Sequence, residues 1–319
     1  MVAPLLEVTD LCKSYATQAG RLTATDGVSF SIAPGETLAL AGESGCGKST
    51  LGKMIAGLIK PDRGSIRLDG QELVGLSHKA MRPKRKRIQM IFQDPFSSLN
   101  PRATVGTILE EPLIVHGLGD RQTRRRSVGE LMERVGLRPE FASRFPHEFS
   151  GGQRQRIGIA RAISLKPDLI ICDEPVSALD VSVRAQILNL LLDLQSEFKL
   201  SYLFISHDLS VIRYVANRVA VMYLGRLVEV GTSEAVCTMP SHPYSQCLVA
   251  ANPVADPGAR AHRAPILQGE PPSPVGKRTG CDFLSRCSFA MPQCKLDRPD
   301  MRSLATGAAV ACHAMAAPA

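Results

Sequence analysis

The segment from Gly42 to Ser49 combines glycines, a lysine and a hydroxyl residue at a spacing suited to holding phosphate groups. It reads GESGCGKS and fits the pattern G-x-x-x-x-G-K-S/T. An apolar run, Thr37 to Ala41, precedes it, and a run with apolar residues at helical spacing, Lys48 to Leu58, follows it. We therefore expect a strand, a glycine-rich turn and a helix, with backbone N–H groups converging on phosphate oxygens at the helix N-terminus.

Two side chains of this loop have specific expected roles. Lys48 is expected to reach the β- and γ-phosphates of ATP, and Ser49 to ligate Mg²⁺. The remaining expected contacts with the nucleotide come from the loop and the first helical turn: Gly42, Ser44, Gly45, Cys46, Gly47 and Thr50. The alternative, a strand-to-helix turn that binds nothing, is disfavoured because the complete pattern stands in its expected context.

Two carboxylates end a second apolar run, Leu169 to Glu174. Asp173 is suited to helping hold Mg²⁺, and Glu174 to orienting or deprotonating an attacking water. A strand that ends in acidic residues is common and usually structural. Downstream of a complete phosphate loop, it predicts nucleotide hydrolysis.

A third pattern, Phe149-Ser-Gly-Gly-Gln153 followed by an arginine-rich helical run, resembles the signature motif of the ABC ATPase family. The usual first residue there is Leu, so Phe149 is a departure that keeps an apolar side chain. In the family this turn contacts the γ-phosphate held by the other subunit of a head-to-tail pair. The resemblance therefore implies nucleotide contacts across a dimer from Ser150, Gly151, Gly152 and Gln153.

Four further positions match the family. Tyr15 is similar to the aromatic residue that stacks on adenine, and Gln93 to the glutamine that senses Mg²⁺ and contacts the membrane subunit. Asp180, in Ser177-Ala-Leu-Asp180, resembles the loop that couples the two active sites, and His207 resembles the switch histidine on the γ-phosphate. The resemblance implies Glu174, His207 and Lys48 as catalytic residues, and Ser49, Gln93 and Asp173 as Mg²⁺ ligands.

Several longer stretches are similar to the ATPase subunits of bacterial dipeptide and oligopeptide importers: Gln93 to Pro101, Glu174 to Val183 and Ser241 to Tyr244. Val105 to Pro112 is similar to the second of the two ATPase subunits in such importers. The resemblance implies ATP-driven dimer closure that energises peptide uptake. Relatives that import nickel, glutathione or cell-wall peptides leave those cargoes as alternatives.

The implied partners are a second, non-identical ATPase subunit, two transmembrane permease subunits and, indirectly, an extracytoplasmic substrate-binding protein. The implied location is the cytoplasmic face of the bacterial inner membrane, as a peripheral subunit. One rival is a soluble ABC ATPase acting on ribosomes or DNA repair complexes, which usually has two ATPase domains or a long coiled coil. Another is a non-catalytic regulatory module, which the intact Glu174 and His207 disfavour.

Composition agrees with a soluble globular chain: of 319 residues, 44% are hydrophobic and 21% charged. No run approaches the roughly 20 apolar residues that span a bilayer, and the first ten residues do not resemble a secretory signal. A cytosolic location with reduced thiols follows. The net charge of +8 gathers at Lys79 to Arg87 and Arg121 to Arg126. Because no aromatic residues alternate with these, solvated helix faces are expected first, anionic lipid second and nucleic acid last.

The predicted fold is α/β: an ABC-type P-loop NTPase core with an antiparallel β subdomain, an inserted helical subdomain and a small cysteine-containing C-terminal extension. Alternating residues predict antiparallel strands within Glu7 to Thr37. Further strands are expected at 88–92, 169–172, 202–205 and 219–223, and a helix at 183–198. The predicted domains are an ATPase domain, 1–235, with its helical subdomain at about 95–162, and the extension, 236–319. Pro271 to Pro274 is predicted to be a stiff spacer.

Four of the nine cysteines, Cys281, Cys287, Cys294 and Cys312, lie in the extension with 5, 6 and 17 residues between successive thiols. The other five are interpreted as packing residues. A reducing compartment disfavours disulfides, and resemblance to the subfamily favours a 4Fe–4S cluster on these four thiols. Zn²⁺, with His313 as a substitute ligand, and an unmetallated tail stay open. The role expected of the tail is structural, since it lies far along the chain from the phosphate loop.

Overall fold

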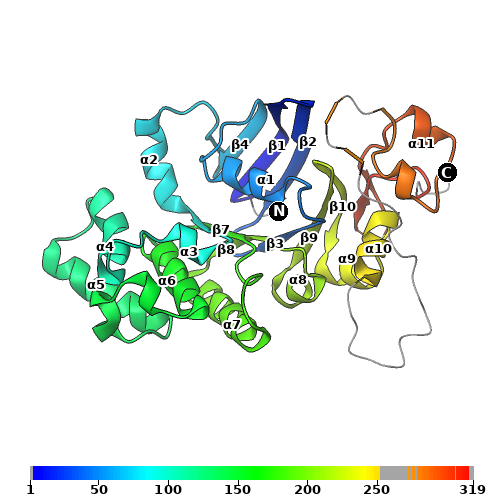
Figure 1. Cartoon of the computed structure of the whole chain (residues 1–319). Coiled ribbons are helices and arrows are strands. Elements are labelled where there is room, and N and C mark those ends of the chain that lie inside the picture. The colour runs from blue at the N-terminus through cyan, green and yellow to red at the C-terminus, as the bar shows by residue number, and fades with distance from the viewer. Residues whose placement is uncertain (1–2, 252–271, 274, 277–278, 306, 316–319) are drawn as a thin grey trace. The chain divides into compact units, whose positions relative to one another are not determined.

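The computed structural model describes residues 3–251, 272–273, 275–276, 279–305 and 307–315 (Figure 1). The predicted Pro271–Pro274 spacer falls largely outside these residues. The chain divides into two compact units. The first contains 1–33, 37–75 and 204–319, and the second contains 34–36 and 76–203.

An antiparallel sheet opens the first unit. Strands β1 (Leu6–Thr17) and β2 (Gly20–Ile32) pair along their length, and β4 (Arg63–Leu68) and β5 (Gln71–Glu72) extend the sheet in the order β2-β1-β4-β5 (Figure 1). Alternate apolar residues of these strands are buried, among them Leu6, Val8, Leu11, Val28 and Ile32. This confirms the antiparallel strands predicted within Glu7 to Thr37, whereas β4 and β5 lie beyond the predicted stretch.

The phosphate-loop strand belongs to a second sheet. Strand β3 (Thr37–Ala41) pairs in parallel with β9 (Arg218–Tyr223), and β9 pairs antiparallel with β10 (Arg226–Thr232). Two short strands of the C-terminal extension, β12 (Ala309–Val310) and β11 (Arg302–Ser303), continue the order beyond β10. The extension therefore adds strands directly to the sheet that carries the phosphate loop.

The first unit also contains helices. They are α1 (Lys48–Ile55), α8 (Leu209–Val215), α9 (Ser233–Thr238) and α10 (Pro243–Ala250), followed in the extension by the 3₁₀ turn η4 (Leu284–Arg286) and by α11 (Gln293–Leu296). One apolar core joins β3, β9, α8, α9 and α10, and Phe283 of the extension belongs to it. The extension thus shares its main apolar contacts with the ATPase part.

The second unit is mainly helical, and it extends beyond both ends of the helical subdomain predicted at about 95–162. Its parallel strands β6 (Ile88–Ile91) and β7 (Leu169–Asp173) run side by side, with Ile91 opposite Cys172. Its helices are α2 (His78–Arg87), α3 (Pro95–Ser98), α4 (Val105–Val115), α5 (Arg121–Arg134), α6 (Gly151–Ile163) and α7 (Val181–Phe198), with 3₁₀ turns η1 (Pro139–Ser143) and η2 (Pro146–Glu148).

Both basic clusters lie on helices of the second unit. Only Met81 is buried on α2, and only Val128 and Met132 on α5. The lysines and arginines of both clusters are exposed or partly exposed, so both clusters are accessible to solvent. Among the described residues, no helix has both the length and the apolar composition to cross a membrane.

Candidate nucleotide site

The phosphate loop contacts neighbouring backbone so closely that two of its positions require glycine. Gly42, with φ 146°, lies where a Cβ atom would be 2.2 Å from the carbonyl oxygen of Met222 on β9. Gly47, with φ 107°, lies where a Cβ atom would be 2.0 Å from the carbonyl oxygen of Ala24 on β2. Any side chain at either position would displace a strand, so the glycines fix where the loop runs.

Lys48 lies inside the curl of this loop. Its side chain is buried, and its Nζ donates to the carbonyl oxygens of Gly42 at 2.7 Å and Glu43 at 2.9 Å. Burial raises the pKa of the nearby Cys46 thiol. Cys46 is therefore a neutral packing residue.

Gly47 is the N-cap residue of helix α1 and provides no side-chain cap. Ser49 and Thr50 lie in its first turn, as the sequence predicted. The first N–H groups of a helix have no partner within the helix, and together with the helix dipole they favour an anion at that end. Phosphate loop and helix N-terminus thus converge as expected for a triphosphate site.

Tyr15 and His207 belong to the same unit as the loop. Tyr15 lies on β1 opposite Leu22 with 37% of its surface exposed, and the Nζ of Lys13 lies 5.5 Å from its ring centroid. His207 is exposed in the turn between β8 (Ser201–Ile205) and α8. The preceding N–H, that of Ser206, donates to the carbonyl of Leu40 on β3 at 3.2 Å.

In the second unit, the structure brings Gln93 and Glu174 together. These residues follow the parallel strands β6 and β7, and the Nε2 of Gln93 donates to Oε2 of Glu174 at 2.9 Å. Asp173, the last residue of β7, is buried. Glu174 has a φ of 46°, a left-handed conformation that costs a non-glycine residue roughly 1–2 kcal/mol. Backbone strain of this kind is typical of functional positions.

The signature-like turn caps α6. The Oγ of Ser150 accepts the N–H of Gln153 at 3.3 Å, and Oε1 of Gln153 accepts the N–H of Ser150 at 3.0 Å, which is a capping box. A Cβ atom at Gly152 would lie 2.4 Å from Val183 of α7, so glycine permits this packing, and Gly151 lies beside it at the start of α6. Ser150 is exposed.

Two neighbouring features complete this part of the unit. Phe149 is buried and packs edge-on against Phe141, with ring centroids 6.2 Å apart, so the departure from Leu keeps an apolar anchor. Asp180, the exposed N-cap residue of α7, makes no side-chain cap bond to that helix.

Sequence reasoning missed two arginines on α6. The guanidinium of Arg154 lies 3.7 Å from the ring centroid of Phe96, and Nη1 of Arg161 donates to the carbonyl of Ser98 at 2.6 Å. Both contacts hold α3, the helix that follows Gln93. The spacing of seven residues puts both arginines on one helix face, and that spacing was the available signal.

The four tail cysteines lie near one another. The N–H of Cys281 donates to the carbonyl of Cys294 at 2.8 Å. Burial raises the pKa of Cys281 to about 11 and also raises those of Cys287 and Cys312, and the neighbouring thiols act in the same direction. Within the described residues, however, no group of three or more His, Cys, Asp or Glu side chains is arranged to hold a metal ion. Nothing in this geometry supports the predicted cluster.

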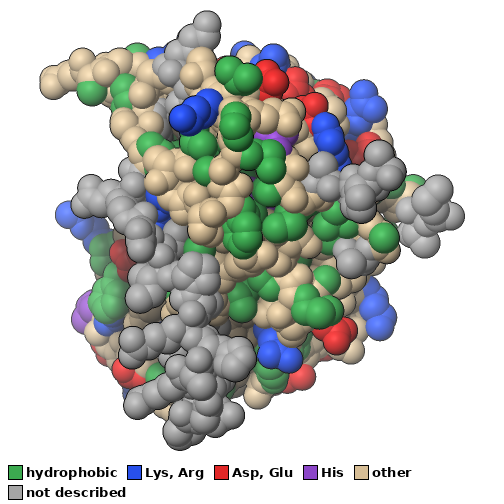
Figure 2. All heavy atoms as spheres, turned by 90° about the vertical axis from the view of Figure 1, so that its right-hand side faces the viewer, with side chains coloured by type: hydrophobic (Ala, Val, Ile, Leu, Met, Phe, Trp, Pro, Cys, Tyr) green, Lys and Arg blue, Asp and Glu red, His purple; other side chains and the backbone are tan. Residues whose placement is uncertain are grey.

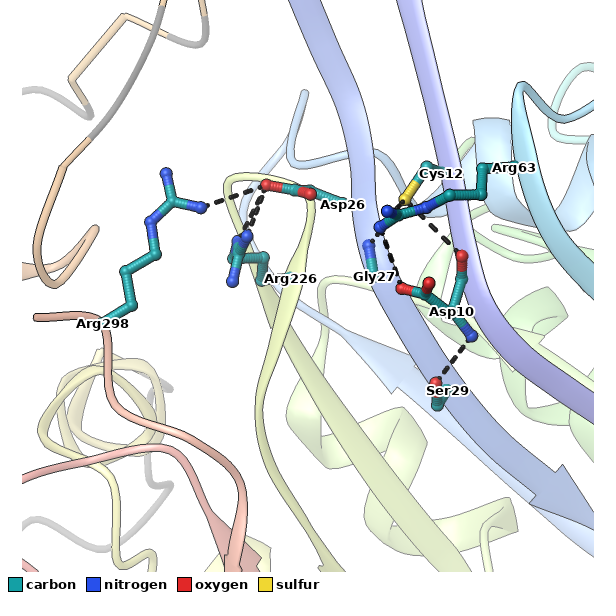
Figure 3. Close-up of polar contacts among 8 residues, drawn as sticks. All are labelled: Asp10, Cys12, Asp26, Gly27, Ser29, Arg63, Arg226 and Arg298. Carbon is teal, nitrogen blue, oxygen red and sulfur yellow. Dashed lines mark hydrogen bonds and ion pairs between the residues drawn. The ribbon is translucent and has the colours of Figure 1, made fainter.

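Cys12 differs from the packing role predicted for it. Its half-exposed thiol accepts hydrogen bonds from the N–H of Gly27 at 3.1 Å and from Arg63 at 3.3 Å (Figure 3). The distance along the chain does not keep the extension away from the phosphate loop. Arg286 of the extension forms an ion pair with Glu43 of the phosphate loop.

Comparison with known proteins identifies the family of this chain. The family "ABC transporter" matches residues 25–177, and "Oligopeptide/dipeptide transporter, C-terminal region" matches residues 228–294. The chain is 50% identical to "Probable peptide ABC transporter ATP-binding protein y4tS" of Sinorhizobium fredii, over 98% of this chain and 90% of that protein. It is also 50% identical to "Oligopeptide transport ATP-binding protein AppF" of Bacillus subtilis, over 97% of each.

Among solved structures, "Dimeric structure of a post-hydrolysis state of the ATP-binding cassette MJ0796 bound to ADP and Pi" matches with a TM-score of 0.66 and 29% identity, over 72% of this chain and 98% of that chain. The fold class and the ATPase activity inferred from the motifs agree with these relatives. The chain belongs to the family of ABC transporter ATP-binding proteins that have an oligopeptide/dipeptide transporter C-terminal region.

Proposed function

We propose that this chain is the ATP-hydrolysing subunit of an importer whose cargo is di- or oligopeptides. The observation that carries the cargo class is 50% identity with peptide transport ATP-binding proteins through both matched regions, including residues 228–294. Nickel, glutathione and cell-wall peptides are the alternative cargoes.

In this proposal the phosphate loop holds the triphosphate, while Tyr15 stacks on adenine. Loop N–H groups and Lys48 bind the phosphate oxygens, because both supply donors or positive charge at the helix N-terminus. The hydroxyl, amide and carboxylate oxygens of Ser49, Gln93 and Asp173 are ligand types that suit Mg²⁺, so the donor set fits. Bound there, the ion would offset the negative charge of the phosphates.

Glu174 is proposed to accept the proton of the attacking water. The hydrogen bond from Gln93 orients its carboxylate, and the left-handed backbone at Glu174 fixes the direction in which the side chain leaves β7. His207 is proposed to contact the γ-phosphate and to stabilise the charge that develops there.

Closure of a head-to-tail pair is proposed to complete each site. The exposed Ser150, at the N-terminus of α6 with Gly151 and Gly152, would contact the ATP held by the partner subunit, and Asp180 would couple the two sites. A non-identical ATPase partner is proposed, with this chain as the second of the two. Closure would drive two permease subunits from the cytoplasmic face of the cell membrane, and an extracytoplasmic binding protein would deliver the cargo.

Helix α3 is the proposed contact with a permease subunit. Phe96 is 63% exposed, directly follows the Gln93 segment, and is held from behind by Arg154. A large apolar side chain that is both exposed and fixed is suited to a protein interface. This contact would place the permease next to the hydrogen bond between Gln93 and Glu174.

A 4Fe–4S cluster on Cys281, Cys287, Cys294 and Cys312, with Zn²⁺ as the alternative, stays a prediction carried by the resemblance. Its proposed role is structural, because the extension exposes apolar side chains such as Phe289 and Leu296 and has little core of its own.

Reconstitution tests the proposed function. The complex purified with its permease subunits should take up labelled dipeptide into vesicles only with hydrolysable ATP, and excess unlabelled peptide should compete. Uptake of Ni²⁺ or glutathione without peptide uptake would replace the cargo. Purification without any multi-span membrane partner, but with ribosomes or DNA, would contradict the transporter assignment.

A further inference from the structure

The C-terminal extension contacts the phosphate loop through one charged pair. Arg286 ends η4, and its Nη1 and Nη2 donate to the two carboxylate oxygens of Glu43 at 2.9 and 3.0 Å. The Arg286 side chain is only 4% exposed, and its Nη1 also lies 3.4 Å from the hydroxyl of Tyr223. Two parallel hydrogen bonds between a guanidinium and a carboxylate fix orientation as well as distance.

Glu43, the second residue of the phosphate loop, is held at all of its polar groups. Its N–H donates to the hydroxyl of Tyr244 at 2.9 Å, its carbonyl accepts from Lys48 at 2.9 Å, and its carboxylate pairs with Arg286. Tyr244 and Arg286 both come from the C-terminal part of the first unit. The conformation in which the loop begins therefore depends on residues more than 200 positions away along the chain.

The support behind Arg286 is well packed. Phe283, three residues earlier, is buried against Tyr223 and Tyr244, with ring centroids 5.3 and 5.5 Å away. A second anchor lies at Asp26 of β2, whose Oδ2 accepts from Arg298 of the extension at 3.3 Å and from Arg226 of β10 at 2.6 Å (Figure 3). The part of the extension that carries Arg286 is therefore anchored twice, through Phe283 and through Arg298.

The outer surface of the extension contrasts with this inner side. On the face shown in Figure 2, apolar side chains lie in separate groups broken by polar and charged surface. Leu296 is 75% exposed and Met301 40% exposed. The contacts that join the extension to the ATPase part lie toward the phosphate loop, β2 and β10.

The charge of Glu43 suggests a role for its ion pair with Arg286. A carboxylate in a loop that binds a triphosphate would repel the ligand, and the guanidinium of Arg286 neutralises it. We propose that Arg286 is a positioning residue for nucleotide binding, through which the C-terminal extension neutralises the carboxylate of Glu43 and keeps it paired while the loop accepts ATP. This inference rests on the proposed role of the loop in binding ATP.

Binding of a fluorescent ATP analogue by the full-length subunit tests the inference. Arg286→Met should weaken binding by roughly 10-fold or more, the scale expected when hydrogen bonds to a charged group are lost. Arg286→Lys, which keeps the charge but not the two-pronged geometry, should fall between Arg286→Met and the unaltered chain. Arg302→Met, at an exposed arginine on β11 of the same extension, should bind as the unaltered chain does.

The double variant Glu43→Gln/Arg286→Met separates pairing of the Glu43 charge from a merely structural role of Arg286. It removes the repelling carboxylate and should recover most of the affinity that Arg286→Met loses. If the double variant bound as weakly as Arg286→Met, the loss would reflect a damaged extension, and the inference would be wrong. Unchanged affinity in Arg286→Met would also overturn it, whereas no binding by the unaltered chain would refute the proposed function instead.

Discussion

Replacing Glu174 by glutamine changes basicity while keeping the local structure. The carboxylate accepts a hydrogen bond from Gln93, at 2.9 Å, and the amide oxygen introduced by Glu174→Gln can accept the same bond. The left-handed φ of 46° is equally unfavourable for both residues. What the substitution removes is the group that takes the proton from water.

Glu174→Gln is therefore expected to lower the rate of ATP hydrolysis strongly and the affinity for ATP only slightly. Positioned general bases contribute about 10²- to 10⁴-fold, which corresponds to roughly 3–5 kcal/mol in activation free energy. Affinity for ATP should stay within about 2-fold, because binding is assigned to the loop, Lys48 and the Mg²⁺ ligands. Gln93→Ala should cost less, about 10-fold, because the base remains and only its hydrogen-bonded orientation is lost.

The assay is phosphate release by the assembled complex, paired with nucleotide binding by the isolated subunit. With ATP, the Glu174→Gln complex should accumulate as a closed dimer, measured by size-exclusion chromatography. Glu140→Gln, at a side chain that is 67% exposed on η1, is the matched control and should turn over normally. Near-normal turnover by Glu174→Gln would refute the assignment of Glu174 as the base.

Three further predictions concern other parts of the chain. Lys48→Ala should weaken ATP binding by the isolated subunit, whereas Ser150→Arg should spare binding and block turnover only in the assembled complex. Ser150→Asp keeps an N-cap acceptor and therefore shows whether loss of the cap contributes to the effect. Loss of ATP binding in Ser150→Arg would contradict a nucleotide site formed across the dimer. Burial lowers the pKa of His242 from 6.5 to about 4, so the unfolded chain binds more protons between these values and stability should fall on acidification, by up to about 3 kcal/mol from this residue. His242→Asn keeps an acceptor for the N–H of Tyr244. In denaturant titrations, its free energy of unfolding should fall less between pH 7 and pH 4 than that of the unaltered chain. An equal fall would mean that residues other than His242 cause the acid sensitivity. Anaerobic purification should yield brown protein with about four iron atoms per chain, and Cys287→Ser should remove the colour while sparing ATP binding; colourless protein with stoichiometric zinc would replace the cluster, and protein with neither metal would remove the site.

The structural features around the site that the sequence predicted are those whose geometry is local. Glycine is required at positions 42 and 47 because a neighbouring carbonyl lies too close for any side chain. Both glycines are fixed positions of the phosphate-loop motif. The Ser150-to-Gln153 spacing is that of a capping box, which the structure contains. Buried strands such as β7 could be predicted because a short apolar run, here four residues followed by Asp173, is typical of a buried strand.

Pairing and short elements were harder to predict. The bond between Gln93 and Glu174 depends on β6 lying beside β7 in parallel register, and no pattern within either strand specifies its neighbour. Strands β5, β11 and β12 have two residues each, too few to show any period. Their existence depends on strands already in place, which is tertiary information.

The contact between Arg286 and Glu43 joins residues 243 positions apart, and neither residue stands out on its own. An arginine between cysteines in a polar segment is ordinary, and the second position of the phosphate loop admits any residue in the motif. One physical inconsistency was nevertheless visible: an acidic side chain in a loop built to bind anions opposes the function of that loop. Where a residue breaks a local rule at a functional site, compensation is expected elsewhere in the fold. The acid at position 43 therefore called for a buried cation, and only the folded chain identifies Arg286 as that cation.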